Sequence, residues 1–98
     1  MSQHHLYLEH EGKNTHILMG WDRPMQGYFL VIEKDAAEDE PYWSNLTHAD
    51  DPYPKSIKPY LEVLRDFNID IPDSMIEALE EDGKTNAGNR EVLHTAFK

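Results

Sequence analysis

Residues 4–32 of the chain read HHLYLEHEGKNTHILMGWDRPMQGYFLVI, and this stretch decides the fold class. At its start Leu6 and Leu8 share one face and polar residues share the other, which is the period of a half-buried strand. Residues 15–21 predict a second strand. Residues 28–32 form a continuous apolar run of aromatic and β-branched side chains, which is typical of a strand covered on both faces. Three consecutive strands predict an antiparallel meander.

Turn signals separate these strands. Residues 11–14 suit a hairpin loop, because their glycine and asparagine tolerate positive φ. Residues 22–27 break the pattern again, since their proline cannot donate to a sheet ladder. Residues 41–46 begin with a proline that is tolerated at a strand start or a sheet edge, so they predict a fourth, edge strand. We therefore expect the sheet to span about residues 4–46.

Two amphipathic helices are predicted after the sheet. Apolar side chains recur at helical spacing over about residues 57–67, and Ser56 stands in front of them as an N-cap. A second helix is expected over about residues 73–82. Asp73 or Ser74 is expected to cap it, with Ser74 at the capping-box distance from a glutamate, and Gly83 is expected to end it in the left-handed conformation.

These elements predict one α+β domain over residues 1–98. A three- to four-stranded antiparallel β-meander precedes an antiparallel helical hairpin that packs on one sheet face. The tail, residues 84–98, holds a short apolar set and is expected either to dock or to fray. Tyr7, Leu18 and Phe29 would form a second, half-exposed apolar face, which serves a partner or a dimer unless the tail covers it.

Acidic residues dominate the charge. The chain has 19 acidic and 9 basic residues and a net charge of −10. Most of the acids fall in residues 33–51 and 62–82, so direct binding of nucleic acid is disfavoured. Two interpretations remain open: the acidity maintains solubility, or it forms an acidic face for a basic protein partner.

Several classes of site and location are excluded or disfavoured. The absence of cysteine excludes disulfides, thiolate zinc sites and a cysteine nucleophile. No apolar run reaches the length of a membrane span, and the first twenty residues lack the features of a signal peptide. We expect a cytoplasmic protein, of bacterial type, that does not bind membranes.

The histidines of the first hairpin raise the question of a metal. His5 and His16 would face each other across the two strands, with Tyr7 and Glu9 nearby. Two imidazoles and a carboxylate are a minimal zinc or nickel set. The chain contains no His-Glu-x-x-His motif. We therefore predict no metal site and no cofactor, and expect zinc or nickel to leave the melting temperature unchanged.

Catalysis has weaker support in the sequence than binding. His48 lies near Asp50 and Asp51, which would orient it as a general base, but no nucleophile stands at a defined spacing. No catalytic residue is assigned, and enzyme activity is not expected. The alternative function is a small metal-dependent or acid–base enzyme that uses His48 or the hairpin histidines, which include His5, His10 and His16.

The turn between the second and third strands is the candidate binding site. Tryptophan, tyrosine and arginine dominate interface energetics, and methionine adapts to its partner. The predicted protein-binding residues are Trp21, Arg23, Met25, Tyr28 and Trp43. In the structural alternative, Asp22 closes the turn and Trp21 packs on Met25. The sequence thus predicts a non-catalytic protein-binding or regulatory module, monomeric or homodimeric, whose charge favours a basic protein partner.

Overall fold

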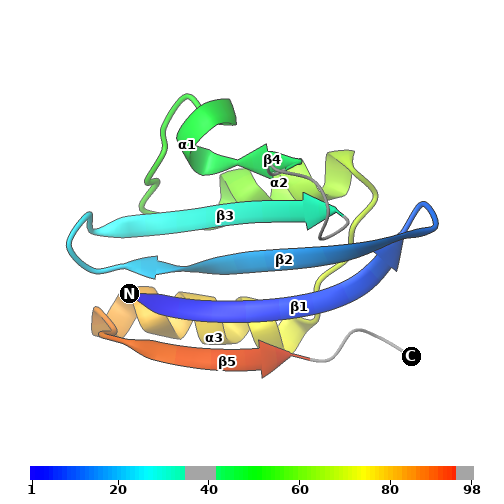
Figure 1. Cartoon of the computed structure of the whole chain (residues 1–98). Coiled ribbons are helices and arrows are strands. Elements are labelled where there is room, and N and C mark those ends of the chain that lie inside the picture. The colour runs from blue at the N-terminus through cyan, green and yellow to red at the C-terminus, as the bar shows by residue number, and fades with distance from the viewer. Residues whose placement is uncertain (35–41, 95–98) are drawn as a thin grey trace.

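The computed structural model describes residues 1–34 and 42–94. These residues form a mixed α+β fold with a five-stranded sheet in the order β4-β3-β2-β1-β5. Figure 1 shows α2 and α3 on one side of that sheet. The elements are β1 (Ser2–His10), β2 (Lys13–Asp22), β3 (Gly27–Lys34), β4 (Trp43–Ser44), α1 (Asn45–His48), α2 (Lys58–Asp66), α3 (Asp73–Thr85) and β5 (Arg90–His94).

The first hairpin has a tighter turn than predicted. His10 pairs with Lys13, so the loop holds only Glu11 and Gly12, at φ 52° and 76°. Two residues at positive φ match the twist of the strands they join, which is why such turns are favoured in hairpins. Asn14 consequently belongs to β2 and is not part of the turn.

The edge strand expected in residues 41–46 is present in shorter form. β4 consists of Trp43 and Ser44 and pairs antiparallel with β3. The next residues turn into α1, because the Ser44 side chain accepts a hydrogen bond from the Leu46 amide and caps the helix.

The segment after α3 corrects the predicted sheet. β5 lies parallel to β1, with Ser2 opposite Arg90 and Leu6 opposite His94. The sheet therefore has five strands and one parallel pair, where three to four antiparallel strands were expected. Two parallel neighbouring strands need a long connection between them, which here runs through the helices. The sequence of the five residues of β5 therefore does not reveal that they pair with β1. Figure 1 shows β5 at the edge of the sheet beside β1.

Helix α2 lies close to its predicted range of 57–67. Ile57 occupies the N-cap position, and the Ser56 hydroxyl accepts a hydrogen bond from the Lys58 amide at 3.2 Å. After the helix, Asn68 takes φ 60°, a left-handed conformation that asparagine tolerates.

Helix α3 is longer than the predicted range of 73–82. It continues through Gly83 to Thr85, and Asn86 ends it at φ 53°. Pro72, and neither Asp73 nor Ser74, holds the N-cap position, without a side-chain capping bond. Gly83 is therefore not a helix terminator. A Cβ atom there would lie 2.0 Å from the Tyr28 hydroxyl oxygen, so the glycine allows the helix to approach the sheet.

The core lies between the sheet and the two longer helices. Burial raises the pKa of the Tyr28 and Tyr60 hydroxyls, which stay protonated as donors. The Tyr28 hydroxyl donates to the Leu79 carbonyl oxygen at 2.9 Å, and that of Tyr60 lies 3.0 Å from the Tyr28 carbonyl oxygen. Leu61 and Phe67, which belong to the apolar set at helical spacing over residues 57–67, are only partly buried at its border. The apolar side chains with no exposed area are Leu6, Ile17, Met19, Leu30, Ile32, Met75 and Leu79.

The contact at Gly83 predicts an unusual effect of alanine in a helix. Glycine to alanine inside a helix normally stabilises by about 1 kcal/mol. We expect Gly83→Ala to lower the free energy of unfolding by about 2 kcal/mol, because the new methyl group meets a buried, hydrogen-bonded Tyr28 ring. Urea unfolding measures the change. Gly88→Ala is the matched control, since its nearest contact of 3.6 Å is ordinary packing. A Gly83→Ala protein as stable as the wild type would contradict this packing.

Candidate functional site

The alternation of β1 sorts its histidines onto two faces. His4 points toward the helices and has no exposed area, whereas His5 points to the opposite face of the sheet, which we call the open face. None of the helices of the described residues lies on the open face (Figure 1). Each face carries its own chain of hydrogen-bonded imidazoles.

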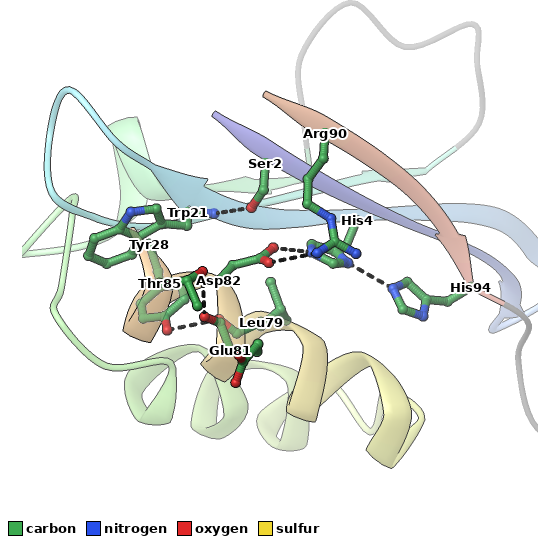
Figure 2. Close-up of polar contacts among 10 residues, drawn as sticks. All are labelled: Ser2, His4, Trp21, Tyr28, Leu79, Glu81, Asp82, Thr85, Arg90 and His94. Atoms are coloured by element: carbon green, nitrogen blue, oxygen red, sulfur yellow. Dashed lines mark hydrogen bonds and ion pairs between the residues drawn. The ribbon is translucent and has the colours of Figure 1, made fainter. Parts of the chain in front are cut away.

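On the helix side, a buried cluster joins β1, α3 and β5. His4 Nε2 lies 2.5 Å from Asp82 Oδ2, and His4 Nδ1 lies 2.8 Å from His94 Nε2. Arg90 donates to the other carboxylate oxygen of Asp82 at 3.1 Å. Figure 2 shows Asp82 projecting from α3 toward His4, with Arg90 and His94 on β5. The cluster therefore ties the edge strand both to the helix and to its neighbouring strand.

Two neutral imidazoles are enough to fill this cluster. His4 Nε2–H donates to the carboxylate, and His94 Nε2–H donates to the free Nδ1 of His4. Burial is the largest cause that lowers the pKa of His94 below its ordinary value of 6.5, and the positive charge of Arg90, or of His4 whenever that ring is protonated, acts in the same direction. Both nitrogens of the fully buried His4 are engaged, so this ring is a structural link rather than a base offered to a substrate.

On the open face, a second row of contacting side chains crosses four strands. Glu91 of β5 lies 3.2 Å from His5 Nε2, and His5 Nδ1 lies 2.8 Å from His16 Nε2 on β2. His16 Nδ1 in turn lies 2.9 Å from Glu33 on β3. We call Glu91, His5, His16 and Glu33 the cross-strand chain. The predicted approach of His5 and His16 is present, with Glu33 and Glu91 as the neighbouring carboxylates.

Apolar side chains surround the cross-strand chain. Tyr7 stacks on the His16 ring at 4.5 Å between centroids and is 59 % exposed. Leu93, opposite His5, is 70 % exposed. Leu18 is half-buried on the same face, and Phe29, expected to be half-exposed, is only 7 % exposed. The open face thus presents exposed apolar side chains beside ionisable ones on a pleated, hydrogen-bonded support.

The predicted binding turn is divided between core and surface. Trp21 and Tyr28 are each 5 % exposed, and their rings meet edge to face at 5.0 Å. The Trp21 indole N–H donates to the Asn86 side chain at 2.9 Å. Asp22 accepts from the Met25 amide, as expected of a residue that closes the turn. Trp21 therefore packs on Tyr28, where the structural alternative had expected Met25.

The remaining predicted binding residues do not form one surface with Trp21. Arg23 and Met25 are exposed on the turn, with Met25 at 53 %. Trp43 lies opposite Ile32, four residues along β3 from Tyr28, and packs against Tyr60. Trp21 and Tyr28 instead line a shallow cavity of about 330 Å³, together with Lys55, Ser56, Ile57, Glu80, Gly83 and Lys84.

The remaining histidines do not add to a metal centre. His10 contacts the Phe67 carbonyl oxygen through Nε2 at 2.5 Å, on the helix side of the sheet. His48 ends α1, and its side chain lies outside the described part of the chain. Within residues 1–34 and 42–94, no group of three or more histidine, aspartate or glutamate side chains is arranged to hold a metal ion.

The sequence did not single out Asp82, Glu91, Leu93 or His94. Asp82 stands next to Gly83 and looked like the end of a helix, and the other three lie in the segment taken as a tail. The alternation of Glu91, Val92 and Leu93 was the available signal for a strand.

Comparisons with known proteins do not assign the chain to a family. No family model matches the chain, and no similar protein was found among curated proteins or solved structures. The helices of the described residues include none that is long and apolar enough to cross a membrane.

Asp82 should be the most sensitive polar residue of the buried cluster. We expect Asp82→Ala to lower the free energy of unfolding by about 3 kcal/mol, because it leaves His4 and Arg90 without their shared acceptor. Glu81→Ala, at the exposed neighbouring position of α3, should change it by less than about 0.5 kcal/mol. Urea titration compares the two variants. Equal, small losses would mean that Asp82 is not paired as described.

The lowered pKa of His94 predicts loss of stability in acid. As the pH falls through 6.5, the unfolded chain takes up the His94 proton before the folded chain does, so the unfolded state gains. The contribution of neutral His94 is present above 6.5 and disappears as the pH falls through the folded pKa. Urea unfolding at pH 7.5, 6.5 and 5.5 should show a smaller decline for His94→Gln than for the wild type. Identical declines would refute the assignment.

Proposed function

We propose that the chain is a non-catalytic protein-binding module that docks a basic protein on the open face. The observation that carries this proposal is the exposure of Tyr7 and Leu93, at 59 % and 70 %, on paired strands of the sheet. Large apolar side chains exposed on a rigid support are typical of partner surfaces. We include a cytoplasmic, bacterial setting in the proposal.

The charges on this face support a basic partner. Glu33 and Glu91 are 56 % and 71 % exposed, and Glu9 follows the same alternation of β1. Lysine and arginine stems of a partner would cover the Tyr7 and Leu93 side chains while their charged ends reach these carboxylates. The net charge of −10 would steer such a partner toward the protein.

The same charges argue against a dimer formed face to face. Two copies of the open face would bring Glu33 and Glu91 of each copy toward the same carboxylates of the other, at a cost in repulsion. We therefore propose a monomer that binds a different protein.

Affinity capture with matched variants tests this proposal. A basic protein captured from the native host should be lost with the double variant Tyr7→Ser, Leu93→Ser and kept with Met25→Ser, whose side chain is exposed on the β2–β3 turn. Both variants change surface positions, so the fold is expected to survive. If capture is lost with Met25→Ser and kept with the double variant, the interface lies at the turn that contains Trp21 and Arg23.

Binding kinetics then separate charge from apolar contact. Raising salt from about 10 to 150 mM shortens the Debye length from about 30 to 8 Å, so association with the captured protein should slow. Tyr7→Ser should mainly speed dissociation. An association rate that ignores salt would show that the acidity serves solubility only, and a partner unaffected by the double variant would refute the open face as the docking site.

A further inference from the structure

One ring nitrogen of the cross-strand chain lacks a hydrogen bond, whereas the other ring nitrogens of His5 and His16 each have one. His5 Nε2 is buried and makes no hydrogen bond with the described residues, yet it lies 3.2 Å from the Glu91 carboxylate. A bare nitrogen lone pair beside a carboxylate oxygen is repulsive. A proton on that nitrogen turns the same contact into a charge-assisted pair.

Counting protons shows that two neutral rings leave the cross-strand chain one proton short, and the missing hydrogen bond at His5 Nε2 places the deficiency there. His16 Nδ1–H is needed to donate to Glu33, and His5 Nδ1–H is needed to donate to His16 Nε2. These two bonds use the single N–H of each neutral imidazole. The contact between His5 and Glu91 therefore requires a third proton, which makes His5 an imidazolium.

The ring geometry fits a proton between the two imidazoles. The planes of His5 and His16 differ by 2°, with centroids 5.1 Å apart and the facing nitrogens 2.8 Å apart. That nitrogen distance is shorter than the roughly 3.5 Å kept by atoms in van der Waals contact. The rings consequently lie nearly end to end in the manner of an N–H···N hydrogen bond.

We propose that the cross-strand chain is a proton-operated switch in the docking surface, with His5 as the group that takes up the proton. This inference rests on the proposed function for its biological role, while the proton uptake itself does not depend on a partner. The positive charge of one added proton offsets one of the two negative charges of Glu33 and Glu91. A second proton would need both facing nitrogens to carry hydrogen, which breaks the bond between the rings.

Within residues 1–34 and 42–94, no basic side chain of the four strands lies on this face beside His5. Tyr7 covers the His16 ring, and Glu9 adds a carboxylate on β1. Among the described residues, the basic side chains of the four neighbouring strands face the helices: Lys13 lies beside His10, Lys34 binds Glu11, and Arg90 binds Asp82. The carboxylates therefore control the charge to which His5 responds.

The switch gives docking a definite direction with pH. Protonated His5 neutralises part of the acidic surface, so a basic partner is held more weakly in mildly acidic solution than at pH 8. One unit of surface charge near a partner charge changes the affinity by about fivefold. Histidine is the side chain that ordinarily changes its charge between pH 5 and 8.

Nuclear magnetic resonance of the ring nitrogens tests the proton uptake on the isolated protein. Between pH 8.5 and 5, the first proton should appear on His5 Nε2 while the His5–His16 bond persists. Glu91→Gln should move this step about half a pH unit lower, and the matched control Glu77→Gln on α3 should leave it unchanged. Independent, simultaneous titration of His5 and His16 that ignores Glu91→Gln would overturn the proposal.

A binding assay tests the link to docking. A fluorescent ten-residue lysine peptide with two leucines should bind the wild type about fivefold more tightly at pH 8 than at pH 5.5. The double variant His5→Gln, His16→Gln should lose most of that ratio. An unchanged ratio in this variant would refute the switch but leave the docking face intact. If the peptide does not bind through Tyr7 and Leu93 while the coupled titration is still observed, the proposed function is refuted but the proton uptake is not.

Discussion

The arrangement of β1, α3 and β5 depends on one buried carboxylate. Asp82 is 1 % exposed, and a charge in that position is tolerated only when it is paired and hydrogen-bonded. Its two oxygens meet this need with groups from different elements, His4 on one strand and Arg90 on another. The helix, the N-terminal strand and the edge strand therefore have to come together in one geometry, and the position of Glu91 and Leu93 on the open face follows from it.

The two chains of hydrogen-bonded imidazoles differ in the number of protons that their contacts require. The buried chain ends in Asp82 and His94, has two contacts, and is complete with two neutral rings. The cross-strand chain has a carboxylate at each end and three contacts, so neutral rings leave it one proton short. A complete network in the interior stabilises one conformation. The proposed switch uses the incomplete network at the surface.

Local patterns predicted the parts of the fold that local forces determine. Local patterns within residues 4–32 identified three strands, and the helical spacing over residues 57–67 identified α2, because each pattern lies within one element. The role of Gly83 was predicted wrongly, since its close approach to Tyr28 involves a residue far away in the chain. The parallel strand β5 was missed for the same reason.

Predicting the candidate site from sequence met the same limit. The facing of His5 and His16 followed from hairpin alternation, but their carboxylate partners come from β3 and β5, whose register no local pattern specifies. β5 also matters for how the chain acquires its structure. Its pairing with β1 closes a loop over most of the described chain, whereas the hairpins close short ones. Until β5 pairs with β1, His4 lacks its His94 partner and the open face lacks Glu91 and Leu93. The proposed binding surface is thus completed only by a contact between distant parts of the chain, so a partly folded chain would not yet present it.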